Sequence, residues 1–250
     1  MEELIHLILK IAATLIESGA EISRVEDSVS RMCRAYGAVA TNTYATTAHI
    51  TVTVEMPDGT LFTQTKRPKQ IGNNFELLDR TNALVRRVSA QAPTAEEIRD
   101  AIAALPRGKY PFYVTALWQG VISAAFCLFF GSRSALECLF AFLIGLALGF
   151  LGHLLDRAES NTLLKSFLLS FLASMLAFTV TRLGAIETPD YIIIGYIMNL
   201  IPGLGFTGAM RDLFVGDLFT GMVRILGALL LAASIAVGFV LTMILFGGVA

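Results

Sequence analysis

A stretch of 19 residues, Phe112 to Phe130, contains no charged side chain. As a helix it would be about 28 Å long at roughly 1.5 Å per residue, close to the ~30 Å hydrocarbon layer of a bilayer. Four further apolar stretches follow. They are Cys138 to Leu155, Thr162 to Thr181, Tyr191 to Met210 and Phe219 to Phe246. The sequence therefore predicts a membrane α-helical bundle of about five transmembrane helices.

The charged residues divide the chain into two parts. Residues 1–110 hold 13 of the 19 Lys and Arg and 13 of the 20 Asp and Glu, whereas residues 111–250 hold the remaining 6 and 7. We therefore expect a charged α+β cytoplasmic domain over residues 1–110 and a transmembrane helical domain over residues 111–250. The net charge of −1 gives no indication of a nucleic-acid partner.

Periodicity predicts the elements of the first part. Apolar residues at helical spacing indicate an amphipathic helix within residues 1–19, and a second helix is expected from Ser23 to Tyr36. Alternation from Tyr44 to Met56 indicates one strand with a buried face, and Thr60 to Lys66 is its expected antiparallel partner. Helices are then expected over residues 74–90 and from Thr94, which is the predicted N-cap.

No set of side chains in the sequence indicates catalysis. His49 is predicted on the polar face of the strand, and no Ser or Cys has an evident base and orienting acid nearby. The cysteines, Cys33, Cys127 and Cys138, have neither metal-ligand nor redox spacing. We expect no enzyme activity, no metal and no cofactor.

The positions of the basic residues predict the orientation in the membrane. If residues 1–110 are cytoplasmic, seven basic residues near membrane ends lie inside and two, Arg133 and Arg182, lie outside. The seven are Arg99, Arg107, Lys109, Arg157, Lys165, Arg211 and Arg224. The N-terminus is therefore predicted in the cytoplasm and the C-terminus, after five spans, outside.

Small residues recur every four positions in three of the spans, which favours close packing of helices. The three series are Ala141, Gly145 and Gly149; Ser166, Ser170 and Ser174; and Ala228, Ala232 and Ala236.

The fourth span contains residues that break helices. Pro202 removes a backbone donor, and Gly203 and Gly205 loosen the helix in mid-span. Many secondary transporters use such breaks to bind substrate with helix termini and freed backbone groups. Asn199 and Thr207 would flank the break as neutral polar groups. A proline kink with packing glycines is the alternative interpretation.

Four ionisable residues follow the break: Arg211, Asp212, Asp217 and Arg224. Charges near a membrane span usually pair or serve a pathway. The expected pairs are Arg211 with Asp212 and Asp217 with Arg224. An interfacial loop with snorkelling arginines remains the alternative.

These residues resemble the signature of the threonine/serine exporter family. The match consists of Ile201-Pro202-Gly203, Arg211-Asp212-Leu213, Gly216-Asp217 and Gly221. A second match is Ser18-Gly19-Ala20-Glu21 with Arg24-Val25-Glu26. The resemblance covers nearly the whole chain, and the order of domain and spans agrees with it. Gly208 departs from the asparagine that we expect near this position in many members.

The resemblance implies a secondary transporter in a bacterial inner membrane that exports threonine and serine, or in some members dicarboxylates, driven by the proton gradient. Many members have about ten spans in two halves, so it also implies a second small multi-span membrane protein that supplies the other half, together with self-association. Glu21, Arg24 and Glu26 become candidates for coupling the cytoplasmic domain to the bundle; alternatively, Glu21 and Arg24 form a local ion pair.

Two functions of other classes compete with transport. A membrane-anchored sensor would bind a metabolite in its cytoplasmic domain, although five spans with a broken helix exceed what an anchor needs. A membrane enzyme would need a nucleophile with its base, a metal cluster or a phosphate loop, and none is evident in the sequence. Transport by reconstituted vesicles separates these possibilities.

Overall fold

The computed structural model describes residues 1–69, 72–106, 110–158 and 161–246. Two basic residues of the orientation count, Arg107 and Lys109, lie outside these ranges. The chain divides into two compact units. One comprises Met1–Gly108 with Phe214–Thr220, and the other Lys109–Leu213 with Gly221–Ala250.

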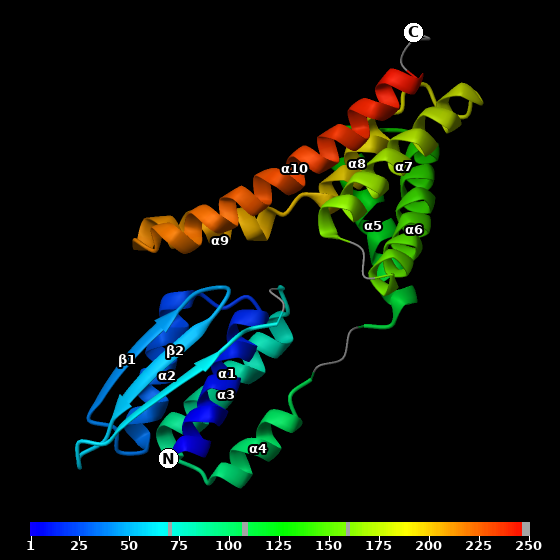
Figure 1. Ribbon diagram of the computed structural model, residues 1–250. Coiled ribbons are helices and arrows are strands. Elements are labelled where there is room, and N and C mark those ends of the chain that lie inside the picture. The colour runs from blue at the N-terminus through cyan, green and yellow to red at the C-terminus, as the bar shows by residue number, and fades with distance from the viewer. Residues whose placement is uncertain (70–71, 107–109, 159–160, 247–250) are drawn as a thin grey trace. The chain divides into compact units, whose positions relative to one another are not determined.

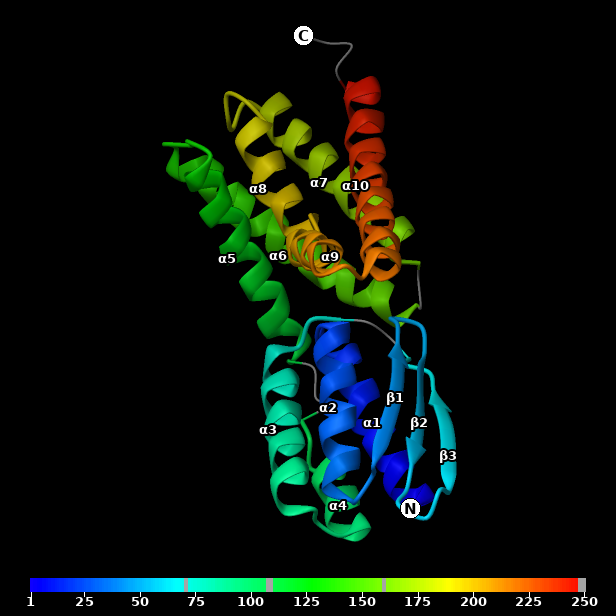
Figure 2. The ribbon, with the colours of Figure 1, turned by 90° about the vertical axis from the view of Figure 1, so that its left-hand side faces the viewer.

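Four helices and a three-stranded sheet form residues 1–106 (Figure 1). The helices are α1 (Glu2–Glu17), α2 (Ile22–Ala35), α3 (Phe75–Gln91) and α4 (Ala95–Ala103). The strands β1 (Ala40–Ala45), β2 (Ile50–Glu55) and β3 (Leu61–Lys66) pair antiparallel in the order β1-β2-β3. Helices α1 and α2 cover one face of the sheet, α3 packs on both of these helices, and α4 packs on α1 (Figure 2).

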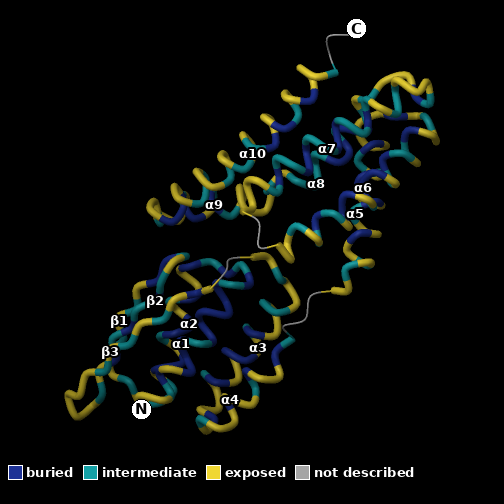
Figure 3. Tube along the Cα trace, turned by 45° about the vertical axis from the view of Figure 1, so that its right-hand side comes forward, coloured by how far each residue is buried: buried dark blue, intermediate teal, exposed yellow. Residues whose placement is uncertain are grey.

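Helix α1 lies at the centre of this unit. Its residues from Ile5 to Ile16 are almost all buried, which Figure 3 shows as a dark blue segment. The inward residues Ile50, Val52 and Val54 of β2 are fully buried and join the same core. The predicted alternation of this strand is therefore confirmed. Asn74 and Thr94 cap α3 and α4 through their side chains, and Thr94 and Glu97 form a capping box.

The prediction of a single strand from Tyr44 to Met56 is wrong at its start. Thr46 ends β1 with a turn, because its Oγ1 accepts hydrogen bonds from the amides of Ala48 (3.2 Å) and His49 (3.1 Å). This turn, which a side chain stabilises, reverses the chain although apolar and polar residues continue to alternate in the sequence. His49 therefore lies in the β1–β2 turn and not on a strand face, and its Nε2 lies 2.9 Å from Thr51 Oγ1.

The second unit contains the apolar helices. Four of them are long and apolar enough to cross a membrane: α5 (Phe112–Phe129), α6 (Ala135–Arg157), α7 (Thr162–Arg182) and α10 (Leu218–Phe246). Helices α8 (Asp190–Leu200) and α9 (Gly203–Val215) together pass the same test and are bent by 49° at the break between them. The described residues thus provide four spans, or five if the bent pair is one span, as predicted.

Polar side chains tie α7 to α10. Ser170 Oγ donates to the carbonyl of Ile235 (2.8 Å), and Thr242 Oγ1 donates to that of Phe171 (3.1 Å). Gly238 makes the approach possible, because a Cβ there would lie 2.6 Å from the carbonyl oxygen of Phe167. The serine series of α7, Ser166, Ser170 and Ser174, is buried, as predicted.

The prediction that the alanine series of α10 packs against another helix is wrong inside this chain. Ala232 and Ala236 are exposed, whereas Ile235, Gly238 and Thr242 are buried. The contact with α7 therefore uses a neighbouring face of α10.

Candidate functional site

The break in the fourth span follows directly from its sequence. Pro202 has no N–H, so it cannot continue the hydrogen-bond ladder to the carbonyl of Met198. The amide of Gly203 instead bonds the carbonyl of Ile201 at 2.8 Å, and the amide of Phe206 bonds that of Pro202 at 2.9 Å. Helix α8 ends at Leu200, and α9 restarts at Gly203 in a direction 49° away. The predicted break is confirmed.

The break lies near the middle of the span. Helix α8 has 11 residues and is therefore about 16 Å long, which is roughly half of a ~30 Å hydrocarbon layer. If the bent pair is one span, the N-terminus of α9 starts inside the hydrocarbon layer. Its first backbone N–H groups have no partner inside the helix and carry the positive end of the helix dipole.

The start of α9 is open. A Cβ at Gly203 would meet nothing within 4 Å, and one at Gly205 would meet only Pro202 Cβ at 3.7 Å. Leu204 and Phe206 are exposed by 58% and 44%. Thr207 turns its hydroxyl back into α9, where Oγ1 lies 3.1 Å from the carbonyl oxygen of Gly203. The backbone at Gly203 and Gly205 is therefore accessible to another molecule.

Asn199, the last polar residue before the break, binds α5. Its Nδ2 donates to Ser123 Oγ at 2.8 Å and to the carbonyl of Gln119 at 3.2 Å. The Oε1 atom of Gln119 is buried and has no hydrogen-bond partner among the described residues. Gln119 and Ser123 were not among the predicted site residues. Their i, i+4 spacing inside an uncharged span is the signal that indicates a polar helix face.

Glycines bring α5, α6 and α8 together at Ser123. A Cβ at Gly145 of α6 would lie 2.6 Å from Ser123 Oγ, and one at Gly195 of α8 would lie 2.6 Å from the carbonyl oxygen of Ser123. A Cβ at Gly149 would lie 2.8 Å from Gln119 Oε1. This α5–α6–α8 junction is closed, and it fixes the position of Asn199 next to the break.

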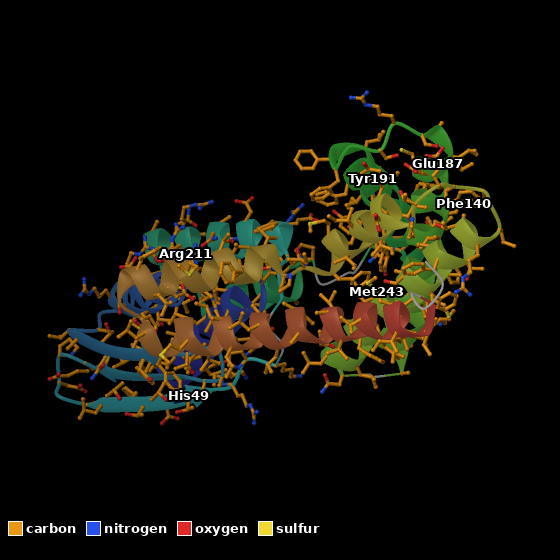
Figure 4. The ribbon with its side chains drawn as sticks, turned by 90° about the horizontal axis from the view of Figure 1, so that it is seen from above. His49, Phe140, Glu187, Tyr191, Arg211 and Met243 are labelled. Carbon is orange, nitrogen blue, oxygen red and sulfur yellow. The ribbon has the colours of Figure 1, made fainter. Side chains whose placement is uncertain are left out.

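The charged residues after the break form a cluster around one carboxylate. Asp212 is 2% exposed and lies 2.6 Å from Arg224 Nη1; Arg224 is 17% exposed. Arg211 Nη2 lies 3.8 Å from the same carboxylate, which confirms the predicted proximity of Arg211 and Asp212. Arg211 lies on α9 (Figure 4).

The predicted pair of Asp217 with Arg224 is wrong. Asp217 Oδ1 accepts the amide hydrogen of Thr220 at 3.1 Å and so caps the start of α10. Arg224 is directed to Asp212 instead, because the turn between α9 and α10 brings these residues together. Gly221 allows that approach, since a Cβ there would lie 2.6 Å from Leu213.

Gly208 adjoins the same cluster. A Cβ at this position would lie 3.9 Å from Arg224 Nη1. An asparagine here, as expected in many members of the family, would therefore place its amide near the guanidinium.

The motif from Ser18 to Glu26 has local contacts inside the first unit. Gly19 has a φ of +98°, and a Cβ there would lie 2.9 Å from Asn73 Oδ1. Glu21 is the N-cap residue of α2, and Arg24 is exposed on that helix. Glu26 Oε1 accepts the amide hydrogen of Ala45 at 2.8 Å and so holds the end of β1. Burial raises the pKa of the Glu26 carboxyl above its ordinary value. A coupling role for Glu21, Arg24 and Glu26 stays a prediction.

The comparison with known families identifies the chain's relatives. A family model described as "Putative threonine/serine exporter" matches residues 6–246. The chain belongs to this family. Two relatives are named "Probable succinate transporter subunit YjjP". The one from Klebsiella aerogenes is 24% identical over 97% of this chain and 93% of its own length. The one from Escherichia coli K12 is 23% identical over 97% of this chain and 94% of its own length. No solved structure matches the chain.

Membership of the exporter family and the apolar helices make this chain a membrane transport protein. The names of both relatives describe a transporter subunit, which implies a partner subunit. Among the described residues, no group of three His, Cys, Asp or Glu side chains is placed to hold a metal ion.

Proposed function

We propose that this chain is one subunit of a secondary transporter that exports small carboxylate-bearing metabolites, and that the substrate binds at the break between α8 and α9. The observation that carries the proposal is the open N-terminus of α9, with Gly203 and Gly205 unobstructed, at about half the depth of the membrane. A helix N-terminus favours an anionic group, and a substrate carboxylate is such a group.

The two candidate substrate classes share this carboxylate. Threonine and serine are the substrates that the name of the family describes. Succinate, a dicarboxylate, appears in the names of both relatives and is favoured by them. A second carboxylate requires a second positive group. Arg211, which is 49% exposed, is more accessible for this role than Arg224, which is held by Asp212.

Coupling to the proton gradient requires a side chain that changes its protonation state, and the two carboxylates after the break are candidates. Asp212 is buried, and its carboxylate is already held by Arg224 at 2.6 Å, with Arg211 3.8 Å away. Asp217 is half-buried and accepts one amide hydrogen. We infer that Asp217 is the better candidate for the proton carrier.

The proposed topology places the N-terminus in the cytoplasm and the C-terminus outside, in a bacterial inner membrane, with a second multi-span subunit as the partner. The seven-to-two distribution of basic residues supports this orientation. Single cysteines at the two ends should react from opposite sides of the membrane. Labelling of both ends from the same side contradicts the topology.

Efflux from vesicles tests the function. Vesicles that contain the chain and its partner are preloaded with labelled succinate, threonine or serine, and efflux is followed with and without a proton gradient. We expect gradient-dependent efflux of one of these substrate classes from vesicles that contain both subunits. The absence of efflux of all three, with binding of a metabolite to the cytoplasmic domain, would instead support a membrane-anchored sensor.

A further inference from the structure

Most glycines of the membrane helices fall into two groups; Gly152 and Gly208, where an added Cβ would make ordinary contacts at 3.6 and 3.9 Å, belong to neither. In the closed group, an added Cβ would lie within 3 Å of an atom of another helix. This group comprises Gly120, Gly145, Gly149, Gly195, Gly221 and Gly238. In the open group, Gly203 and Gly227 have nothing within 4 Å of an added Cβ, and Gly205 has only Pro202.

The closed glycines are explained by this chain, and the open ones are not. A glycine inside a helix is less favourable than alanine by about 1 kcal/mol. Close approach of another helix justifies that cost at the closed positions. At Gly203 and Gly205 neither helix packing in this chain nor a positive φ requires glycine.

Lipid cannot form hydrogen bonds with the exposed backbone at the start of α9. Pro202 interrupts the backbone ladder there, and the residues around it, from Ile201 to Phe206 except Pro202, are exposed. Irregular backbone at membrane depth is tolerated only where protein buries it or where it lines an aqueous cavity. Gly227 is different, because it lies inside the continuous helix α10, whose backbone groups are satisfied within the helix.

We propose that the first turn of α9, Gly203 to Phe206, together with Ile201, is the docking surface for the second subunit, so that the substrate site at the break is completed between the two chains. This inference rests on the proposed function. In this arrangement a helix of the partner approaches Gly205 closely, apolar partner side chains contact Ile201, Leu204 and Phe206, and the backbone at Gly203 faces the substrate.

The names of the relatives favour a different membrane protein over a second copy of this chain. Both relatives are named as subunits, and this chain spans 93% and 94% of their lengths. The named transporters therefore need more than a protein of this size.

Photo-crosslinking tests the docking surface. The multi-span protein that co-purifies with the chain is identified by mass spectrometry and co-expressed with its own affinity tag. A benzophenone-bearing phenylalanine analogue replaces Phe206, which is 44% exposed, or the control Phe150 of α6, which is 47% exposed. We expect the analogue at position 206 to form a covalent product with the tagged partner, and the analogue at position 150 to form none.

A second variant tests the role of the glycines. Gly205→Leu should reduce the crosslink from position 206 about tenfold, because a leucine there holds the partner helix away. Gly227→Leu, at an equally open glycine, should leave it unchanged. Melting temperatures of both variants without the partner should match that of the parent chain.

Three outcomes overturn the proposal. They are a product of twice the 27.0 kDa chain mass that contains only this chain, equal yields of partner product from positions 206 and 150, and an unchanged crosslink in Gly205→Leu. The crosslink does not depend on transport. If the chain crosslinks to its partner but supports no efflux, the docking surface is supported and the proposed function is contradicted. If efflux occurs without the crosslink, the proposed function is supported and the docking surface is contradicted.

Discussion

The α5–α6–α8 junction and the α8–α9 break contain the same residue type in opposite surroundings. At the junction, Gly145 and Gly195 lie against Ser123 so closely that no side chain fits. At the break, Gly203 and Gly205 face open space. The junction glycines therefore serve the folding of this chain, and we propose that the break glycines serve a molecule outside it.

The largest effect is expected at the junction. Gly195→Leu would force a side chain to within 2.6 Å of the α5 backbone, and we expect a loss of at least ~3 kcal/mol of stability, because backbone cannot move aside as a flexible side chain can. Expression level and melting temperature in detergent measure it. The matched control is Gly227→Leu, which should be tolerated. Normal stability of Gly195→Leu would remove the distinction between closed and open glycines.

The ion cluster gives the next largest effect. Asp212→Asn leaves Arg224 without its charged partner in a site that is only 17% exposed, so we expect a loss of ~3–5 kcal/mol. Asp217→Asn should change stability by less than ~0.5 kcal/mol, because asparagine caps a helix about as well as aspartate.

Transport assays on the same two variants sharpen the assignment of the proton carrier. If Asp217 carries the proton, Asp217→Asn should lose dependence on the gradient and keep substrate exchange. Gradient-dependent efflux by Asp217→Asn would exclude Asp217 from that role.

Asn199 belongs to both regions, because it ends α8 beside the break and binds Gln119 and Ser123 of α5. Asn199→Ala removes both hydrogen bonds and should lower stability by about 1 kcal/mol, the usual size of a hydrogen bond between membrane helices. Ser123→Ala removes one of the two acceptors and should cost less. A loss of transport in Asn199→Ala that greatly exceeds the loss in Ser123→Ala would indicate contact with the substrate.

The smallest effect concerns Glu26, whose contact with Ala45 lies inside the first unit. Burial raises the pKa of this carboxyl above 4.5, so the folded domain holds the proton more tightly than the unfolded chain. The resulting stability is fully present below pH 4.5 and is lost as the pH rises through the raised value.

Glu26→Gln removes this titration and keeps an oxygen that accepts the Ala45 amide hydrogen. The melting temperature of the variant, relative to that of the parent chain, should therefore increase between pH 4.5 and neutral pH. Hydrogen exchange in peptides that cover β1 should show the same trend. A difference that does not change with pH contradicts the assignment.

The sequence predicts the spans and the break well, because lipid restricts what an uncharged stretch can form and Pro202 cannot donate a backbone hydrogen bond. It predicts contacts between distant residues poorly. Asp212 and Arg224 are 12 residues apart and meet only because α9 and α10 turn back on each other. Asn199 finds its acceptors 76 and 80 residues away on α5. Periodicity within one helix cannot indicate either contact.

The missed strand has a different cause. β1, Ala40–Ala45, is a short edge strand whose residues are mostly exposed or half-buried, so its alternation is weak. The side chain of Thr46 then ends the strand without glycine or proline, the usual signals of a turn. The buried face of β2 was predicted correctly because Ile50, Val52 and Val54 are strongly apolar.

The most direct test of the break as the substrate site is Gly203→Leu, measured for efflux and melting temperature on the same reconstituted samples. Because a side chain at position 203 meets nothing in this chain, we predict a melting temperature within about 2 °C of the parent chain and a loss of efflux, whereas Gly227→Leu retains both. Efflux by Gly203→Leu at the parent rate, or a loss of efflux in proportion to a loss of folded protein, would contradict a substrate site at the break.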